Sequence, residues 1–173
     1  MAAHSTAGSP HADFSTLLER VRSSGFSFVL HEHEATRTIG EAEANLAFDV
    51  ARIVKTIAFA TRDGRLVLAA LRGTLRVDYA KLARLAGVSR KDLAPLSPRD
   101  VLARIGVAPG GVSPLHGQGH GLVDGEVLLF VDEDVLAIAP TLYCGTGRPD
   151  RTLEMAPADL LALCGGRLGA FSR

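Results

Sequence analysis

Apolar residues recur at two spacings along this 173-residue chain, and each spacing predicts a different kind of element. Positions three or four apart indicate helices, whereas alternation or a short apolar run indicates a strand. With their capping residues, the predicted helices are 13–24, 38–46, 78–85, 97–106 and one starting near 157. The predicted strands are 26–31, 52–60, 66–71, 126–131, one near 142 and 153–155.

The order of these elements favours one α/β domain. The turn 62–65 joins two predicted strands, so we expect strands 52–60 and 66–71 to form a hairpin. Interleaved helices and strands with a hairpin fit a mixed sheet better than a purely parallel one. We expect residues 13–173 to form the domain and residues 1–12, which are small and polar, to form a flexible tail.

Lys55 interrupts the apolar pattern of strand 52–60. Alternation places it on one face with the apolar residues Ile53, Ile57 and Phe59. The other face is also largely apolar, so the strand is predicted to be an inner one. An ammonium group there must reach an edge, find a partner or line a pocket. A lysine with its head in water and a functional lysine both fit the pattern.

Glycine-rich strings supply the other candidate chemistry. Seven glycines lie between residues 106 and 125, and the string 110–114 reads Gly-Gly-Val-Ser-Pro. Glycines permit positive φ and a close approach to the backbone, and successive amides can hold a carboxylate, a phosphate or a developing oxyanion. The string 145–148 reads Gly-Thr-Gly-Arg, and its Arg148 is a candidate phosphate contact. Each string alone is also compatible with an ordinary turn.

Composition narrows the classes of function. Hydrophobic residues make up 47% of the chain, and Lys plus Arg equal Asp plus Glu at 19 each, so a strongly basic nucleic-acid footprint is absent. No apolar run approaches the roughly 20 residues of a membrane span, and the first dozen residues do not resemble a signal peptide. The two cysteines, Cys144 and Cys164, indicate buried thiols in a reducing cytosol, so we expect a cytoplasmic protein.

Three further arrangements are weaker. His31, His33, His116 and His120 could hold zinc, but no H-E-x-x-H motif or cysteine pair supports a metal. Ser113 and His116 suggest a serine hydrolase, yet the nucleophile elbow G-x-S-x-G is absent. Cys144 has no clear base beside it in the sequence, so a structural thiol is favoured.

Taken in order, these strings resemble the YbaK family, which includes the ProX-type deacylases associated with prolyl-tRNA synthetase. The resemblance covers residues 30 to about 163, and its most specific parts are the lysine strand and the GGVSP loop. The remaining matches are His31 with the helix start 38–43, the segment 78–87, Tyr143 with 147–148, and 153–160. It implies a YbaK-like single domain with a mixed, mostly antiparallel curved sheet and surrounding helices.

The resemblance also implies an activity, the hydrolysis of the ester between a wrong amino acid and its tRNA. The expected substrate is tRNA-Pro carrying Ala or Cys, bound through its 3′ end without metal or organic cofactor, and neither DNA nor a membrane is an expected partner. Lys55, Gly110 and Gly111 are the implied catalytic residues. The implied substrate contacts are His31, His33, Val112, Ser113, Pro114, Gly145, Gly147 and Arg148.

Several positions depart from the family pattern. His116 follows Leu115 where glycine is usual, the stretch 117–125 is expanded, and Cys144 replaces a small aliphatic residue. These changes affect the shape of the pocket, and therefore the amino acid that is removed. The alternative function is a binding module that kept the fold and lost the reaction. Neutral net charge favours help from prolyl-tRNA synthetase or an elongation factor in binding tRNA.

Overall fold

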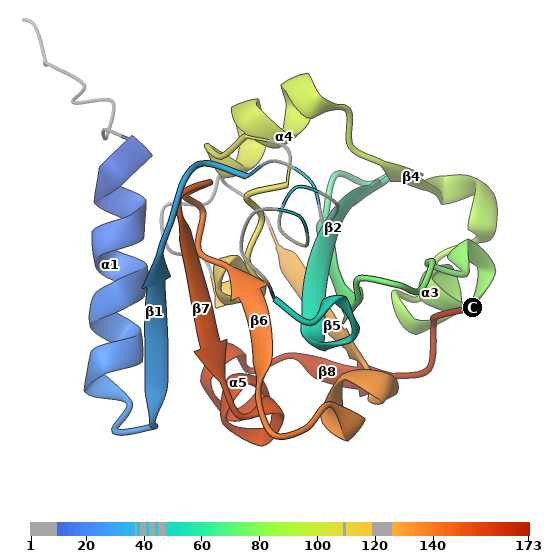
Figure 1. Ribbon diagram of the computed structural model, residues 1–173. Coiled ribbons are helices and arrows are strands. Elements are labelled where there is room, and N and C mark those ends of the chain that lie inside the picture. Colours follow the sequence, from blue (N-terminus) through green and yellow to red (C-terminus); the bar gives the residue numbers. More distant parts are fainter. Residues whose placement is uncertain are drawn as a thin grey trace, which may run out of the picture.

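The computed structural model describes residues 10–36, 38, 41, 44, 48–108, 110–118 and 126–173. Its centre is a twisted sheet with helices on both sides (Figure 1). The strands are β1 (Phe28–Glu32), β2 (Ile53–Thr61), β3 (Leu66–Arg72), β4 (Leu93–Pro95), β5 (Val127–Asp132), β6 (Leu142–Gly145), β7 (Arg151–Met155) and β8 (Arg167–Gly169). The α-helices are α1 (Pro10–Ser23), α3 (Tyr79–Leu85), α4 (Pro98–Ile105) and α5 (Pro157–Cys164).

The sheet is mixed, with the strand order β1-β7-β6-β2-β3-β5-β8 and β4 paired to β2. Antiparallel pairs are β1 with β7, β6 with β7, β2 with β3 and β2 with β4. Parallel pairs are β2 with β6, β3 with β5 and β5 with β8. The expected mixed, mostly antiparallel fold with surrounding helices is therefore confirmed, and so is the hairpin of β2 and β3.

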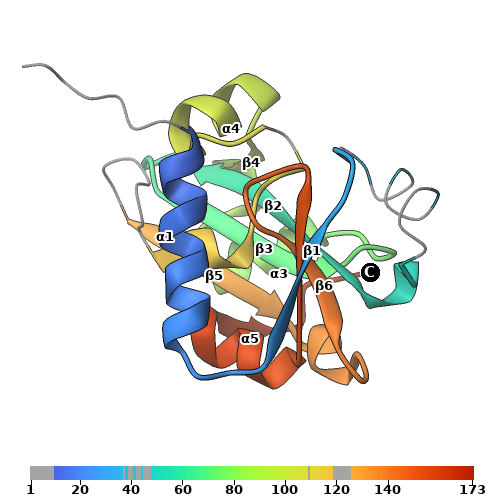
Figure 2. The same cartoon turned by 60° about the vertical axis from the view of Figure 1, so that its left-hand side comes forward.

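Two apolar clusters cover the two faces of β2, which confirms that it is an inner strand. On one face Val54 and Ala58 belong to a cluster that includes residues of α1, α4 and α5. On the other face Phe59 packs with Leu82 of α3 and with Phe171. Figure 2, turned from Figure 1, shows α1 and α5 together on one side of the sheet. The alternation of the β2 side chains thus divides the core into two halves.

Local capping explains why the helices start and stop where they do. The Asp78 carboxylate accepts hydrogen bonds from the amides of Ala80 and Lys81, and the Ser97 hydroxyl accepts one from the Asp100 amide. The helix α4 ends at Gly106, which has a φ of 79°. These contacts satisfy amides and carbonyls that a helix end leaves unpaired. The predicted bounds of α3 and α4 are confirmed on this basis.

Some boundaries differ from the expectations. Helix α1 begins at Pro10, so residues 10–12, which we expected in the tail, are helical, because proline suits the first turn of a helix. Strands β4 and β8 were not predicted, since three residues are too few to show a period. In the helix expected at 38–46, the Glu41 amide donates to the Thr38 hydroxyl, as a capping box requires. Most of that helix lies outside the described residues.

The glycine-rich segment is only partly described. Residues 114–118 form a short 3₁₀ helix, η3 (Pro114–Gln118), where a loop was expected. Pro109 and residues 119–125 lie outside the described part of the chain, as do residues 1–9 of the expected tail. No helix among the described residues has the length and apolar character that a membrane crossing needs.

Candidate active site

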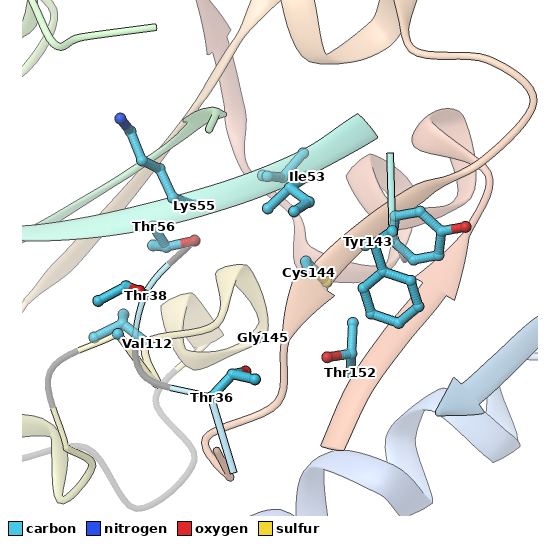
Figure 3. Close-up of a pocket in the computed structure, with 13 residues that line it drawn as sticks. Thr36, Thr38, Ile53, Lys55, Thr56, Val112, Tyr143, Cys144, Gly145 and Thr152 are labelled. Carbon is cyan, nitrogen blue, oxygen red and sulfur yellow. The ribbon is translucent and has the colours of Figure 1, made fainter. Parts of the chain in front are cut away.

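A cavity of about 140 Å³ lies where β2 and β6 meet the loop that contains Gly110 (Figure 3). The parallel register sets Ile53 beside Tyr143 and Val54 beside Cys144, and all four residues line the cavity. The complete lining is Thr36, Thr38, Phe48, Ile53, Val54, Lys55, Thr56, Gly110, Val112, Tyr143, Cys144, Gly145 and Thr152. The structure thus brings four predicted site residues together, namely Lys55, Gly110, Val112 and Gly145.

The two glycine-rich strings pack backbone against backbone beside this cavity. A Cβ atom on Gly111 would lie 3.1 Å from the Ala108 carbonyl oxygen and 3.2 Å from that of Gly147. A Cβ atom on Gly145 would lie 3.3 Å from the Val112 carbonyl oxygen. Such separations are tight for a side-chain carbon, so glycine is what permits the approach. Strings far apart in the sequence therefore form one wall.

Not every amide of the loop 110–113 is available to a ligand. The Gly111 amide donates to the Ala108 carbonyl at 2.9 Å, and the buried Ser113 amide donates to Nδ1 of His116 at 2.8 Å. The amides of Gly110 and Val112 have no acceptor among the described residues. Gly110 also holds a φ of 84°, a conformation that glycine adopts without strain. Gly110 and Val112 are therefore the loop residues with a donor to offer.

Lys55 lines the cavity, but its ammonium group points elsewhere. Figure 3 shows its side chain leaving β2 on the side opposite to Thr56. The Nζ atom donates to the carbonyl oxygen of Gly73 at 3.1 Å and to that of Leu75 at 2.5 Å. Burial, followed by the nearby positive charge of Arg76, lowers the pKa of Lys55. The family resemblance implies that Lys55 acts together with Gly110 and Gly111, whereas the structure places its ammonium across β2 from Val112.

Thr56 is the polar side chain that β2 directs to the cavity side. Its Oγ1 atom is buried and, among the described residues, has no hydrogen-bond partner. A buried hydroxyl without a partner is costly, so its position beside a cavity is a signal for a polar ligand group. The sequence carried this signal as a threonine on the apolar face of Val54 and Ala58. The alternation pattern did not single out Thr56, because Lys55 is the charged residue of that strand.

An aromatic wall closes one side of the cavity. The rings of Phe48 and Tyr143 stack with their centroids 4.2 Å apart, and the Arg52 guanidinium lies 4.6 Å from the Tyr143 ring centroid. Glu154 accepts from His31 at 2.6 Å and from Arg52 at 3.1 Å. Hydrogen bonds from Thr141 and then from His31 lower the pKa of Glu154. This network holds the wall in place.

The two predicted histidine contacts lie behind the cavity lining. His31 is engaged by Glu154 and meets the ring of Phe48 edge-on at 5.1 Å. His33 bonds through Nε2 to the Thr152 hydroxyl at 2.8 Å. Neither imidazole lines the cavity, although Thr152 and Phe48 do. These histidines are therefore placed to position lining residues, and their predicted contact with substrate stays a prediction.

The remaining predicted contacts also lie outside the lining. Ser113 is completely buried, and its hydroxyl accepts from the Leu115 amide at 3.2 Å, which stiffens the turn into η3. Pro114 is buried next to it, and Gly147 faces Gly111. A nucleophilic serine must be reachable, so this burial argues against the serine-hydrolase interpretation.

Arg148 forms an internal ion pair. Its Nε and Nη2 atoms donate to the two carboxylate oxygens of Asp150, each at 2.8 Å, and its guanidinium lies 5.3 Å from the Phe14 ring centroid. The hydrogen bonds from Arg148 lower the pKa of Asp150 to about 2. A bidentate pair of this kind occupies the Nε and Nη2 donors of Arg148 and offsets its charge.

The other candidate chemistries find little support in the described residues. Burial raises the pKa of Cys144 to about 12, so its thiol is neutral and a poor nucleophile. Within the described ranges no three His, Cys, Asp or Glu side chains are grouped as a metal site requires. Of the four histidines considered for zinc, His120 lies outside those ranges, and the expected absence of a metal stays a prediction.

The fold and the site together describe a mixed α/β domain with a small cavity beside glycine-rich backbone. Residues 33–163 match the family described as the aminoacyl-tRNA editing domain, which is most of the chain. The protein therefore belongs to the aminoacyl-tRNA editing domain family.

Solved structures agree with this assignment. The chain resembles the hypothetical protein APE2540 at 25% identity and a TM-score of 0.78, over 91% of this chain and 99% of that one. It resembles a candidate trans-editing enzyme for prolyl-tRNA synthetase at 29% identity and a TM-score of 0.74, over 96% and 99%. A signal-transduction candidate from Marinobacter aquaeolei VT8, 15% identical with a TM-score of 0.63 over 91% and 30%, shares the fold alone. Comparison with curated proteins returned no match.

Proposed function

We propose that this protein is a trans-editing hydrolase that deacylates mischarged aminoacyl-tRNA. The observation that carries the proposal is the 140 Å³ cavity, which is bordered by Gly110 and Val112, two residues whose amides have no acceptor within the described part of the chain. Membership of the editing-domain family supports an aminoacyl-tRNA as the substrate class. Similarity to a candidate trans-editing enzyme for prolyl-tRNA synthetase supports tRNA-Pro as the tRNA.

The size of the cavity favours a small aminoacyl group. A cavity of about 150 Å³ holds one benzene molecule, so the 140 Å³ here suits one short side chain and not a nucleotide. Alanine and cysteine are the amino acids we propose. An apolar pocket discriminates one methylene by only about 1–3 kcal/mol, so steric exclusion is the better means of sparing proline.

The proposed reaction needs positioning and oxyanion stabilisation more than a strong nucleophile. Water attacks the ester carbonyl carbon, the bond from that carbon to the ribose oxygen breaks, and the ribose oxygen takes up a proton. The products are the free amino acid and the tRNA with its hydroxyl restored. Amides of Gly110 and Val112 would stabilise the oxyanion, and one such donor contributes about a hundredfold or more to the rate. Cys144 is neutral and takes no part.

The test is release of labelled amino acid from a panel of mischarged tRNAs, beside the Gly110→Val variant. We expect release from tRNA-Pro carrying Ala or Cys, with loss in the variant. A wild-type protein that binds these tRNAs but releases no amino acid would instead be a binding module of the same fold. Assays with and without prolyl-tRNA synthetase or elongation factor test whether the neutral chain needs a partner.

A further inference from the structure

A second cavity, of about 600 Å³, lies near the N-terminus of α3 and includes Lys55 in its lining. Its volume falls within the range of about 300–1,000 Å³ that is usual for ligand pockets. The complete lining is Lys55, Ile57, Arg76, Val77, Asp78, Tyr79, Ala80, Arg90 and Arg173. Neither the proposed hydrolysis nor the editing-family sequence match accounts for this cavity.

The second cavity is strongly basic although the chain is neutral overall. Four cationic side chains and one carboxylate line it, so its side chains sum to 4 − 1 = +3, whereas the whole chain has a formal net charge of 0. The Asp78 carboxylate is already engaged by the amides of Ala80 and Lys81. A concentration of one sign of charge in a hollow attracts a ligand of the other sign.

Two of the three arginines that line this cavity have no carboxylate partner in the part of the chain that the structure describes. Among the described residues, neither Arg76 nor Arg90 forms an ion pair with a carboxylate. The Arg90 guanidinium lies 4.7 Å from the Tyr79 ring centroid and donates to the Leu93 carbonyl at 3.2 Å, which holds it at the cavity. Arg76 is exposed, and its charge is close enough to affect Lys55. Guanidinium groups match the geometry of phosphate oxygens.

We propose that the second cavity binds phosphate groups of the RNA strand whose aminoacylated end enters the first cavity. This inference rests on the proposed function. It follows from the position of Lys55, which lines both cavities and so links them across β2. A strand held by its phosphates at Arg76 and Arg90 would present its 3′ end to the cavity at Gly110. Because the whole chain has a formal charge of 0, the side chains outside this lining sum to −3, so the attraction for RNA concentrates at this surface.

The experiment measures binding of an uncharged RNA minihelix with a single-stranded 3′ end by fluorescence anisotropy, over about 50–200 mM salt. We expect Arg76→Gln to weaken binding several-fold and to reduce the slope of log K against log salt by about 0.7, as for one lost phosphate contact to a single strand. Arg76→Lys keeps the charge and should keep the slope. Arg99→Gln, an exposed arginine of α4 outside both linings, should bind as the wild type does.

Two outcomes would overturn the proposal. One is an Arg76→Gln protein, folded by thermal melting, that binds the minihelix with unchanged affinity and salt slope. The other is a variant that loses binding of inorganic phosphate but keeps binding of RNA, which would assign the cavity to a small phosphorylated ligand.

Hydrolysis of an aminoacyl-adenosine, which has no phosphate, separates this proposal from the proposed function. Arg76→Gln should hydrolyse that compound at the wild-type rate. A different outcome is a wild-type protein that hydrolyses no aminoacyl ester while the salt dependence of its RNA binding still depends on Arg76. In that case the proposed function fails and the phosphate site is retained.

Discussion

The two faces of β2 differ in size, charge and chemistry. The face of Thr56 borders a cavity of about 140 Å³ lined by apolar, hydroxyl and glycine residues and by Lys55, whose ammonium points to the other face. The face of Lys55 borders a cavity of about 600 Å³ with four cationic side chains. Because successive side chains of a strand point to opposite faces, two adjacent residues serve different sites. In the functions that we propose, selection by size and attraction by charge would therefore act on opposite faces of β2.

The largest effect is expected from Gly110→Val on the small-cavity side. A β-branched residue at a φ of 84° is strained by about 1–3 kcal/mol and would displace a loop whose amides we assign to the oxyanion. Deacylation should fall about a hundredfold or more. The measurement is single-turnover release of amino acid, together with urea unfolding.

Gly106→Val is the matched control for this prediction. Gly106 has a φ of 79°, and no atom lies within 4 Å of the position that its Cβ atom would take. Valine at this position would therefore introduce the same backbone strain, but away from the cavity. Equal activity losses in both variants would contradict the assignment of Gly110. Gly111→Val is a poorer test of the site than Gly110→Val. Its Cβ atom would press on two carbonyl oxygens, so we expect it to destabilise the fold as well.

The second prediction concerns Lys55→Met on the basic side. Loss of the ammonium leaves the Gly73 and Leu75 carbonyls without a donor, so the free energy of unfolding should fall by about 2 kcal/mol. For aminoacyl-tRNA we expect KM to rise about tenfold with little change in kcat, equivalent to about 1.4 kcal/mol. Lys55→Arg should keep most of the affinity. A fall in kcat on aminoacyl-adenosine would instead support the catalytic role that the family resemblance implies.

The third prediction concerns Thr56→Val, which removes the unpartnered hydroxyl at nearly constant shape. The free energy of unfolding should rise by about 1 kcal/mol, because a buried group without a partner is lost. Deacylation should fall about fivefold if the hydroxyl bonds to the substrate, the effect of one neutral hydrogen bond. Thr152→Val is the control, since its hydroxyl is bonded to His33 and its loss should lower stability. Unchanged turnover of Thr56→Val would remove Thr56 from the site.

The smallest effect is expected from Asp150→Asn, in the turn after β6. Arg148 lowers the pKa of Asp150 from its ordinary value of 3.8 to about 2. The ion pair therefore contributes its full stabilisation at pH values above 3.8. That contribution is lost as the pH falls through about 2. The variant should be less stable than the wild type by up to about 1 kcal/mol near neutral pH, with equal deacylation. Urea unfolding of both proteins at acidic pH checks this prediction. A difference in the free energy of unfolding between variant and wild type that persists below the lowered pKa of Asp150 would contradict it.

Local signals in the sequence were sufficient for much of the fold. Asp78 and Ser97 as helix caps, Gly106 as a helix end and the turn 62–65 were predicted, because each depends on neighbours a few residues away. The apolar character of both faces of β2 also sufficed to predict an inner strand. Strands β4 and β8 were missed because pairing with a distant strand, not a periodic pattern, makes them strands.

The candidate site was only half predictable for the same reason. Motif order indicated the lysine strand and the glycine loop, and both line one cavity. The direction of the Lys55 ammonium depends on the Gly73 and Leu75 carbonyls, which no pattern associates with it. Phe48 and Tyr143 contribute to the cavity wall because their rings stack on each other. Thr56 contributes to the cavity because its face of the sheet is the one that meets the glycine loop.

The amino-acid sequence by itself determined the succession of elements, the burial of β2 and the presence of glycine backbone able to approach a ligand, since these follow from short-range periodicity and conformational freedom. Tertiary structure alone decided that the strings at Gly111 and Gly147 touch and that Lys55 faces a basic cavity. Those outcomes depend on strand register and on partners far away in the chain. A one-residue shift of register would exchange the two faces of β2 and their roles.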